Sequence, residues 1–145
     1  MNIVLLGYMG CGKTTIGKII SKLTGKKFID LDSYIESTTN QTISDLFSSK
    51  GEIYFRKLEK NSLKVIMAKY DNIVLSLGGG TPCYSNNLTI IKNSKSFFLK
   101  NSINTLSNRL ININSSRPIL SNIDNLDTMN DHIAKHLFER NYYYN

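Results

Sequence analysis

Cysteine is scarce in this chain, whose 145 residues include only Cys11 and Cys83. Two thiols cannot build the disulfide framework that holds small secreted domains together, so we expect a reducing, cytoplasmic setting. No apolar run approaches the roughly 20 residues that cross a bilayer. No basic segment precedes the first apolar run either, so we expect neither a membrane span nor a secretory leader.

Long runs of a single charge are also missing. The net charge is +7, from 18 Lys and Arg against 11 Asp and Glu, but the charges are scattered and no run of five or more occurs. A basic balance can serve nucleic-acid binding, and small anionic substrates account for it equally well. Charge alone therefore leaves both classes of partner open.

The chain has the size and the patterning of a single α/β domain. At 41% hydrophobic residues over 145 positions, it is large enough to bury a real core. Short apolar runs alternate with helix-period segments, which is typical of a parallel sheet with connecting helices. With no internal repeat and no linker in sight, we predict one domain over residues 1–145.

A glycine-rich loop occupies residues 7–14, with the sequence Gly-Tyr-Met-Gly-Cys-Gly-Lys-Thr. A strand-length apolar run precedes it, and a helical pattern follows it with apolar residues on one face at Ile16, Ile19, Ile20 and Leu23. In this context G-x-x-x-x-G-K-T is typical of phosphate loops. Glycines let several N–H groups point at a polyphosphate, Lys13 supplies a charge, and the Thr14 hydroxyl can ligate Mg²⁺. We predict that the chain binds a nucleoside triphosphate.

Two aspartates follow the predicted second strand, Lys27–Ile29. Ligands of a parallel sheet lie at the carboxyl ends of its strands, so Asp30 and Asp32 should lie beside the phosphate loop. Strand alternation would point both to the same side, where one could serve a metal and the other a substrate hydroxyl. The alternative for Asp32 is that it merely caps the next helix.

Residues 33–70 carry a helical pattern that is interrupted at Lys50-Gly51. Arg56 and Glu59 are three apart on the last of these helices and therefore neighbours. On sequence alone, the favoured interpretation is a surface ion pair that contributes little. A third strand, residues 72–77, then leads into Gly78-Gly79-Gly80, and three glycines indicate a close approach to a ligand more than a plain turn.

The last third of the chain offers a loop and a pair of histidines. Residues 111–125 are rich in Asn and Ser and contain Arg117, and a loop carrying a cation is typical of a lid over ATP phosphates. An exposed loop with an incidental arginine is the alternative. In the final predicted helix, about residues 126–140, His132 and His136 are four apart. No third ligand accompanies them, so we interpret them as surface histidines and not as a metal pair.

Six segments together resemble the shikimate kinase family in order and approximate spacing. They are Gly7–Thr14, Phe28–Asp32, Gly51-Glu52 with Phe55-Arg56-x-x-Glu59, Gly78–Gly80, Arg117–Leu120 and Glu139-Arg140. Many enzymes share the phosphate loop, whereas the six together are specific and cover nearly the whole chain. The resemblance implies transfer of the ATP γ-phosphoryl group to the 3-hydroxyl of shikimate. It also implies a Mg²⁺ cofactor and a cytoplasmic, monomeric enzyme whose partners are ATP and shikimate, with no nucleic acid and no membrane.

The same resemblance implies a P-loop fold of the nucleoside-monophosphate-kinase type. This fold is a three-layer α/β/α arrangement with strand order 2-3-1-4-5.

The resemblance also assigns the site residues. The catalytic residues would be Asp32, Lys13 and Arg117, with Asp32 accepting the proton of the reacting hydroxyl. ATP would be bound by Gly10, Cys11, Gly12, Lys13, Thr14, Thr15, Arg109 and Arg117. Shikimate would be bound by Asp32, Arg56, Glu59, Gly78, Gly79, Gly80 and Arg140, with a substrate-binding helical segment at about residues 33–60. The metal ligands would be Thr14 and Asp30. The resemblance therefore implies that Arg56 and Glu59 are part of a clamp for the shikimate carboxylate and not a surface pair.

Two departures from the family pattern lead to expectations of their own. Asn40 stands where the family usually has glycine, and because Asn tolerates left-handed geometry we expect the turn to survive. The family also continues well past its counterpart of Arg140, adding a fifth strand, a loop against the adenine and a last helix. We therefore expect either that the natural polypeptide extends beyond Asn145 or that the 145-residue form is poorly stable, with a bare fourth strand and Arg140 near a fraying end.

Two other function classes compete with this interpretation. One is another P-loop small-molecule kinase, such as a gluconate- or nucleoside-monophosphate-type kinase, although no Asp-Gly-Phe-Pro-Arg segment or equivalent occurs. The other is a non-enzymatic nucleotide-binding module that uses the basic charge.

Overall fold

The computed structural model of the chain describes residues 1–113, 123 and 125–145. The predicted lid at residues 111–125, including Arg117, lies largely outside the described residues. Within them, the elements in chain order are β1 (Ile3–Leu6), α1 (Lys13–Thr24), β2 (Lys27–Asp30), α2 (Leu31–Thr39), α3 (Ile43–Lys50), α4 (Glu52–Lys69), β3 (Ile73–Ser76), the 3₁₀ turn η1 (Thr81–Cys83), α5 (Asn87–Ile90), β4 (Lys95–Phe98), α6 (Ile103–Ile111) and α7 (Leu126–Tyr144).

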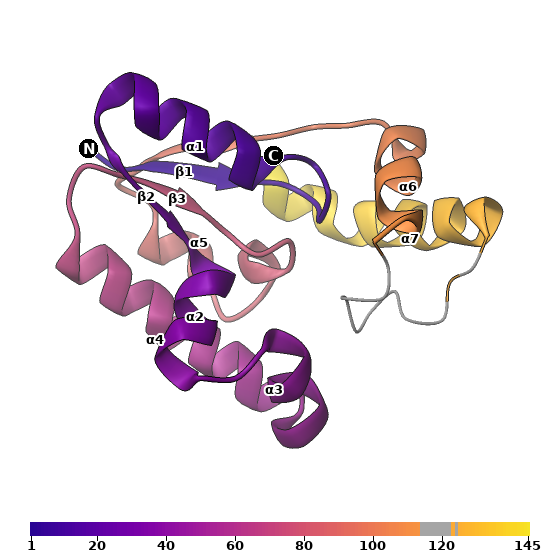
Figure 1. Cartoon of the computed structure of the whole chain (residues 1–145), viewed down its shortest axis with the longest axis horizontal. Coiled ribbons are helices and arrows are strands. Elements are labelled where there is room, and N and C mark those ends of the chain that lie inside the picture. The colour runs from indigo at the N-terminus through magenta and orange to yellow at the C-terminus, as the bar shows by residue number, and fades with distance from the viewer. Residues whose placement is uncertain (114–122, 124) are drawn as a thin grey trace.

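The four described strands form one parallel sheet in the order β2-β3-β1-β4. This confirms the predicted class and the first four places of the predicted order. Side chains alternate along β1, so Val4 and Leu6 face one side while Leu5 faces the other. α1 packs on the Leu5 side and α4 on the opposite side, which gives the helix–sheet–helix layers seen in Figure 1.

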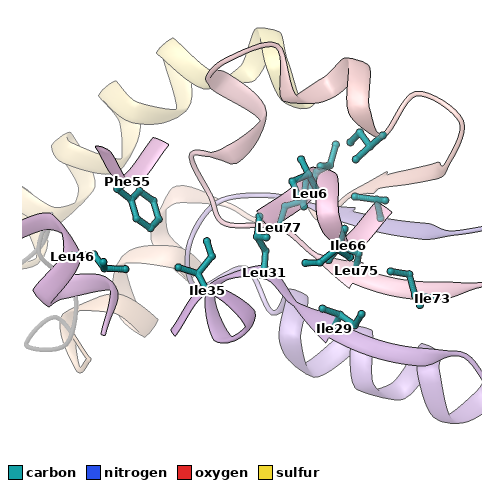
Figure 2. Close-up of a cluster of buried hydrophobic side chains, with 13 residues drawn as sticks. Leu6, Ile29, Leu31, Ile35, Leu46, Phe55, Ile66, Ile73, Leu75 and Leu77 are labelled. Carbon is teal, nitrogen blue, oxygen red and sulfur yellow. The ribbon is translucent and has the colours of Figure 1, made fainter. Parts of the chain in front are cut away.

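The main core lies between the sheet and the helices α2, α3 and α4 (Figure 2). Strand residues such as Leu75 meet Leu63 and Ile66 of α4, all of them inaccessible to solvent. Phe55 and Leu46 extend this cluster to α3. Phe55, Leu63 and Ile66 form the buried face of α4, and this contact holds the helices of the expected substrate segment against the sheet.

The apolar face predicted for α1 is present but largely faces solvent. The side chains of Ile16, Ile19 and Leu23 are exposed, Leu23 to 81%. The helix instead contacts the sheet through Gly17, where an added Cβ would lie only 2.4 Å from Cε2 of Phe28. Because a glycine lets the helix approach the strands so closely, the contact face is set by Gly17 and not by the isoleucines.

A second core cluster connects the phosphate loop to the C-terminal helices. Tyr8, Met9 and Cys11 pack against residues of α6 and α7, among them Leu110 and Ile133, and all five are buried. The helices α6 and α7 lie side by side at one end of the sheet (Figure 1). The back of the phosphate loop is therefore part of a hydrophobic core, which fixes its position on the sheet.

The ends of α2 and α7 can be compared with what the sequence predicts for them. Asn40 ends α2 with φ 54°, so the left-handed turn expected at the position of the family glycine is confirmed. α7 does not end at Arg140 but continues to Tyr144, which is 4% exposed. Tyr144 therefore packs against the protein, and the expectation about the stability of the 145-residue form stays a prediction.

Candidate active site

The loop at residues 7–14 has the geometry of a phosphate cradle. Gly10 and Gly12 adopt φ values of 78° and 97°, which are available to glycine with little strain. α1 begins immediately afterwards at Lys13, so the positive end of its dipole points into the loop. Nζ of Lys13 donates to the carbonyl oxygens of Gly7 at 2.8 Å and Tyr8 at 2.9 Å, which holds the ammonium across the loop.

A cleft of about 870 Å³ opens between the phosphate loop and the carboxyl ends of the strands. The predicted ATP and metal residues that line it are Gly10, Cys11, Gly12, Lys13, Thr14, Thr15, Asp30 and Arg109, and the predicted substrate residues that line it are Asp32, Gly78 and Gly79. Nη1 of Arg109 also donates to the Gly10 carbonyl at 3.0 Å, which ties α6 to the loop. The structure thus brings together most of the predicted residues, and Arg117 lies outside the part of the chain that it describes.

The two aspartates do not share a strand, which corrects the alternation argument. β2 ends at Asp30, whose carboxylate caps α2 by accepting the Ser33 N–H at 3.2 Å, and Asp32 lies in the first turn of that helix. The aspartate that caps α2 is therefore Asp30 and not Asp32, for which this role was the alternative prediction. Both still line the cleft, because a capped helix turn leaves its first side chains beside the strand end.

Asp30 also contacts the phosphate loop directly. The Thr14 hydroxyl donates to Oδ2 of Asp30 at 3.1 Å. A hydroxyl and a carboxylate side by side in a phosphate cleft are hard oxygen donors of the kind that Mg²⁺ prefers. Among the described residues, no group of three or more His, Cys, Asp or Glu side chains could enclose a metal ion.

The glycine segment 78–80 lies within contact distance of three parts of the site. A Cβ added at Gly78 would lie 3.1 Å from Oδ1 of Asp32, and one at Gly79 would lie 3.1 Å from the Met9 nitrogen in the phosphate loop. At Gly80 the added atom would be 2.8 Å from Nη2 of Arg56. Side chains at these positions would separate the phosphate loop from the residues predicted to bind substrate. The predicted close approach to a ligand stays a prediction.

Arg56 and Glu59 form a buried ion pair, and the surface-pair interpretation is wrong. Nη1 of Arg56 donates to Oε2 of Glu59 at 3.0 Å, and Glu59 is 1% exposed. Oε1 of Glu59 accepts the Thr81 hydroxyl at 2.6 Å. Both carboxylate oxygens of the buried acid are therefore satisfied, as the cost of burying a charge requires. The guanidinium also lies 4.1 Å from the centre of the Tyr84 ring, which restricts its plane further.

Arg140 reaches the same region from α7. It is 8% exposed, and its Nη1 has no hydrogen-bond partner among the described residues. Burial raises the pKa of the neighbouring Cys83 thiol, while the positive charges of Arg140 and Arg56 both act to lower it. Two guanidinium groups from different helices therefore lie near one thiol, next to the glycine segment. Neither arginine is among the residues that line the cleft, and both lie beside it next to the glycine segment.

Sequence reasoning missed several polar residues of this region. Thr81 is fully buried and bonds Glu59, while Asn87 donates to the Thr81 carbonyl at 2.9 Å. Thr81 directly follows the three glycines, and this position is the sequence signal that could have identified it as part of the site. Asn101 donates to the Cys11 carbonyl at 3.2 Å and so supports the phosphate loop from the end of β4. Nothing in its local sequence indicates this contact.

The two histidines predicted to lie on the surface are instead partly buried, and His136 contacts the phosphate loop. Nδ1 of His136 lies 2.8 Å from the Tyr8 hydroxyl, and the ring of His132 packs 4.3 Å from that of His136. Burial, reinforced by the charge of Arg140, lowers the pKa of His136 to about 4. The prediction failed because the face of α7 that packs on the loop includes His136 as well as Ile133.

A phosphate loop after the first strand, a carboxylate pair after the second and a cleft between them define a P-loop kinase of the α/β class. The family model for shikimate kinase matches residues 9–145. A curated shikimate kinase from Flavobacterium johnsoniae is 49% identical over 145 residues, covering 99% of this chain and 84% of that relative. The chain belongs to the shikimate kinase family.

Solved structures agree with this assignment. A shikimate kinase from Bacteroides thetaiotaomicron superposes with a TM-score of 0.92 at 39% identity, covering 99% of this chain and 81% of the other. A shikimate kinase from Acinetobacter baumannii, solved in complex with shikimate, gives a TM-score of 0.90 at 30% identity, with 99% and 77% covered. These relatives are thus longer than this chain.

Proposed function

We propose that this chain transfers the γ-phosphoryl group of ATP to the 3-hydroxyl of shikimate, a step of aromatic amino-acid biosynthesis. The observation that carries the proposal is the buried Arg56–Glu59–Thr81 arrangement against Gly80, one residue from the glycine that contacts the phosphate loop. It provides a fixed cation for an anionic acceptor next to a triphosphate cradle. The relative from A. baumannii, whose structure contains shikimate, supports this choice of acceptor.

The carboxylate of shikimate is the group that two arginines would recognise. Arg56 is already aimed by Glu59, and Arg140 has a buried Nη1 without a partner among the described residues. A guanidinium binds a carboxylate through charge-assisted, often bidentate hydrogen bonds. The N–H groups of Gly79 and Gly80 would bind the remaining oxygens of shikimate. Side chains at these two positions would keep the substrate too far away for these hydrogen bonds.

Asp32 would act as the general base. Its carboxylate lies at the start of α2, lines the cleft, and is in contact range of Gly78 between the two subsites. A base in this place can hydrogen-bond the reacting hydroxyl and accept its proton as phosphoryl transfer proceeds.

The donor side of the reaction depends on charge neutralisation. Lys13, the loop N–H groups and the positive end of α1 would hold the ATP phosphates, and Arg109 would bind the nucleotide at the edge of the cleft. We assign Arg117 to the lid, outside the described residues. When bound, Mg²⁺ would be held by the Thr14 and Asp30 oxygens and would neutralise phosphate charge.

We further propose that the enzyme is a cytoplasmic monomer whose partners are its two small substrates. The cysteine usage supports a reducing compartment, since both Cys11 and Cys83 are free thiols. Among the described helices, none combines the length and the apolar character needed to cross a membrane.

A coupled assay of ADP release tests the function. Purified protein is incubated with Mg-ATP alone, with shikimate, and with gluconate or a nucleoside monophosphate as competing acceptors. We expect ADP release that depends on shikimate and is far slower with the other acceptors. Equal turnover with any competing acceptor, or ADP release that ignores shikimate, would contradict the proposal.

A further inference from the structure

The last turn of α7 carries three consecutive tyrosines, and Tyr144 is drawn into the protein much further than its neighbours. Tyr144 is 4% exposed, whereas Tyr142 and Tyr143 are 87% and 37% exposed. Its ring stacks on Phe98 at the end of β4, with centroids 4.9 Å apart and planes at 20°. Phe98 itself lines the cleft. Tyr144 therefore lies beside the site, one helical turn after Arg140.

The hydroxyl of Tyr144 bonds the glycine segment. It donates to the Gly79 carbonyl oxygen at 2.5 Å. A trans peptide unit is planar, with its C=O and N–H pointing in opposite directions. Fixing the Gly79 carbonyl on Tyr144 therefore directs the Gly80 N–H away from Tyr144. Since glycine has the widest choice of backbone conformations, this segment is the one most in need of an external restraint.

The same phenol interacts with Arg140. Burial raises the pKa of Tyr144, so the hydroxyl keeps its proton, while the charge of Arg140 and a side-chain hydrogen bond to it act in the opposite direction. Arg140 is thus held by a residue that also holds Gly79. Among the described residues, Tyr144 therefore links two proposed substrate contacts, Gly79 and Arg140, which lie in distant segments of the chain. Tyr144 and Gly79 themselves are 65 positions apart.

We propose that Tyr144 is a positioning residue for the acceptor half of the site. By binding the Gly79 carbonyl it aims the Gly80 N–H at the substrate, and through Arg140 it fixes the guanidinium that binds the carboxylate. The inference rests on the proposed function, because the acceptor whose oxygens these groups meet is shikimate. It adds to that function a residue that touches neither the substrate nor ATP.

The test compares Tyr144→Phe, which keeps the stacked ring and removes the hydroxyl, with the matched control Tyr142→Phe on the exposed side of the same turn. Steady-state kinetics give KM for shikimate, KM for ATP and kcat. A neutral hydrogen bond contributes a factor of roughly 3 to 10 in affinity. We expect Tyr144→Phe to raise KM for shikimate by about that factor, with kcat within about twofold, because the aimed groups bind the ground state and transition state alike. KM for ATP should not change, and Tyr142→Phe should match wild type.

A second readout reports the geometry itself. In ¹⁵N-labelled protein, the amide of Gly80 should shift on addition of shikimate in wild type and in Tyr142→Phe, and shift differently in Tyr144→Phe. Equal shikimate KM values for both variants would overturn the inference while leaving the proposed function intact. Parallel losses in shikimate KM, ATP KM and melting temperature would also overturn it, since they indicate a general structural role. Wild-type protein without shikimate-dependent turnover would refute the proposed function and this inference with it.

Discussion

The Thr81 hydroxyl donates a hydrogen bond of 2.6 Å to Oε1 of Glu59, and both side chains are almost completely buried. The other oxygen of Glu59 accepts from Arg56 at 3.0 Å. Thr81 thus supplies one of two hydrogen bonds to the buried carboxylate of Glu59. The other comes from Arg56, a proposed substrate ligand. The direction in which Arg56 points depends on a threonine in a different segment of the chain.

Replacing this threonine tests the dependence. Thr81→Val keeps the volume but leaves Oε1 of Glu59 without its donor, and a hydrogen bond to a charged group contributes about 1.5–3 kcal/mol. We expect the free energy of unfolding to fall by that amount in urea denaturation, and shikimate to bind more weakly by calorimetry. Thr81→Ser retains a hydroxyl and should restore most of both. Wild-type stability in Thr81→Val would show that Glu59 does not need the bond.

Removal of the charge of Asp32 should impair chemistry and spare the fold. In Asp32→Asn we expect kcat to fall by roughly 10²- to 10⁴-fold, the usual contribution of a positioned general base. ATP affinity should be retained, because the phosphate loop is unchanged. Asp71→Asn, at an exposed position, provides the control. Turnover of Asp32→Asn close to that of the control would refute the assignment.

The two halves of the site should respond separately to loss of an arginine. Arg140→Ala should weaken shikimate binding by about 10- to 150-fold, the equivalent of one charge-assisted contact of about 1.5–3 kcal/mol. ATP affinity should barely change. Arg109→Ala, which alters the nucleotide edge of the cleft, should give the reverse pattern. Calorimetric titration of each variant with each substrate measures both. A loss of ATP binding in Arg140→Ala would mean that its role is misassigned.

Acid should destabilise the protein through His136. Its pKa is lowered from 6.5 to about 4 in the fold by burial and then by the charge of Arg140. His132 and Lys135 lower it further by smaller amounts, and the charge of Glu139 opposes the shift. Between these values the unfolded chain binds a proton that the folded protein does not, so protonation favours unfolding. The contribution to stability is fully present above pH 6.5 and is lost as the pH falls towards 4.

His136→Gln removes this titration. We therefore expect its melting temperature to depend less on pH than that of wild type over the same interval, measured by differential scanning calorimetry. Carboxylate titrations are common to both proteins and cancel in the comparison. Identical slopes would show that His136 keeps its ordinary pKa.

The sequence was most informative where chemistry dictates both residue type and spacing. In the phosphate loop, Gly12, Lys13 and Thr14 are each required by phosphate geometry, and the structure places them as predicted. Gly78–Gly80 lie next to the phosphate loop and to Arg56, as their position after the third strand indicates, and their approach to a ligand stays a prediction. These features are local, so a short stretch of sequence contains all the information that they need.

Features that depend on tertiary packing could not be predicted in this way. The spacing of Arg56 and Glu59 fits a surface pair equally well, and only the packing of α4 against Thr81 buries it. His136 meets Tyr8 across 128 positions of sequence. The contact face of α1 depends on Gly17 meeting Phe28, which the period of the isoleucines does not indicate.

Asp30 accepts two hydrogen bonds, from Thr14 on the phosphate-loop helix through Oδ2 and from the Ser33 N–H in the first turn of α2 through Oδ1. One carboxylate therefore joins the helix that begins at Lys13 to the helix that carries Asp32. A displacement of Thr14 alters the first bond and, through the rigid carboxylate, the second. Any coupling free energy that this carboxylate transmits between the donor and acceptor sites is reciprocal by linkage. The factor by which ATP changes the affinity for shikimate equals the factor by which shikimate changes the affinity for ATP.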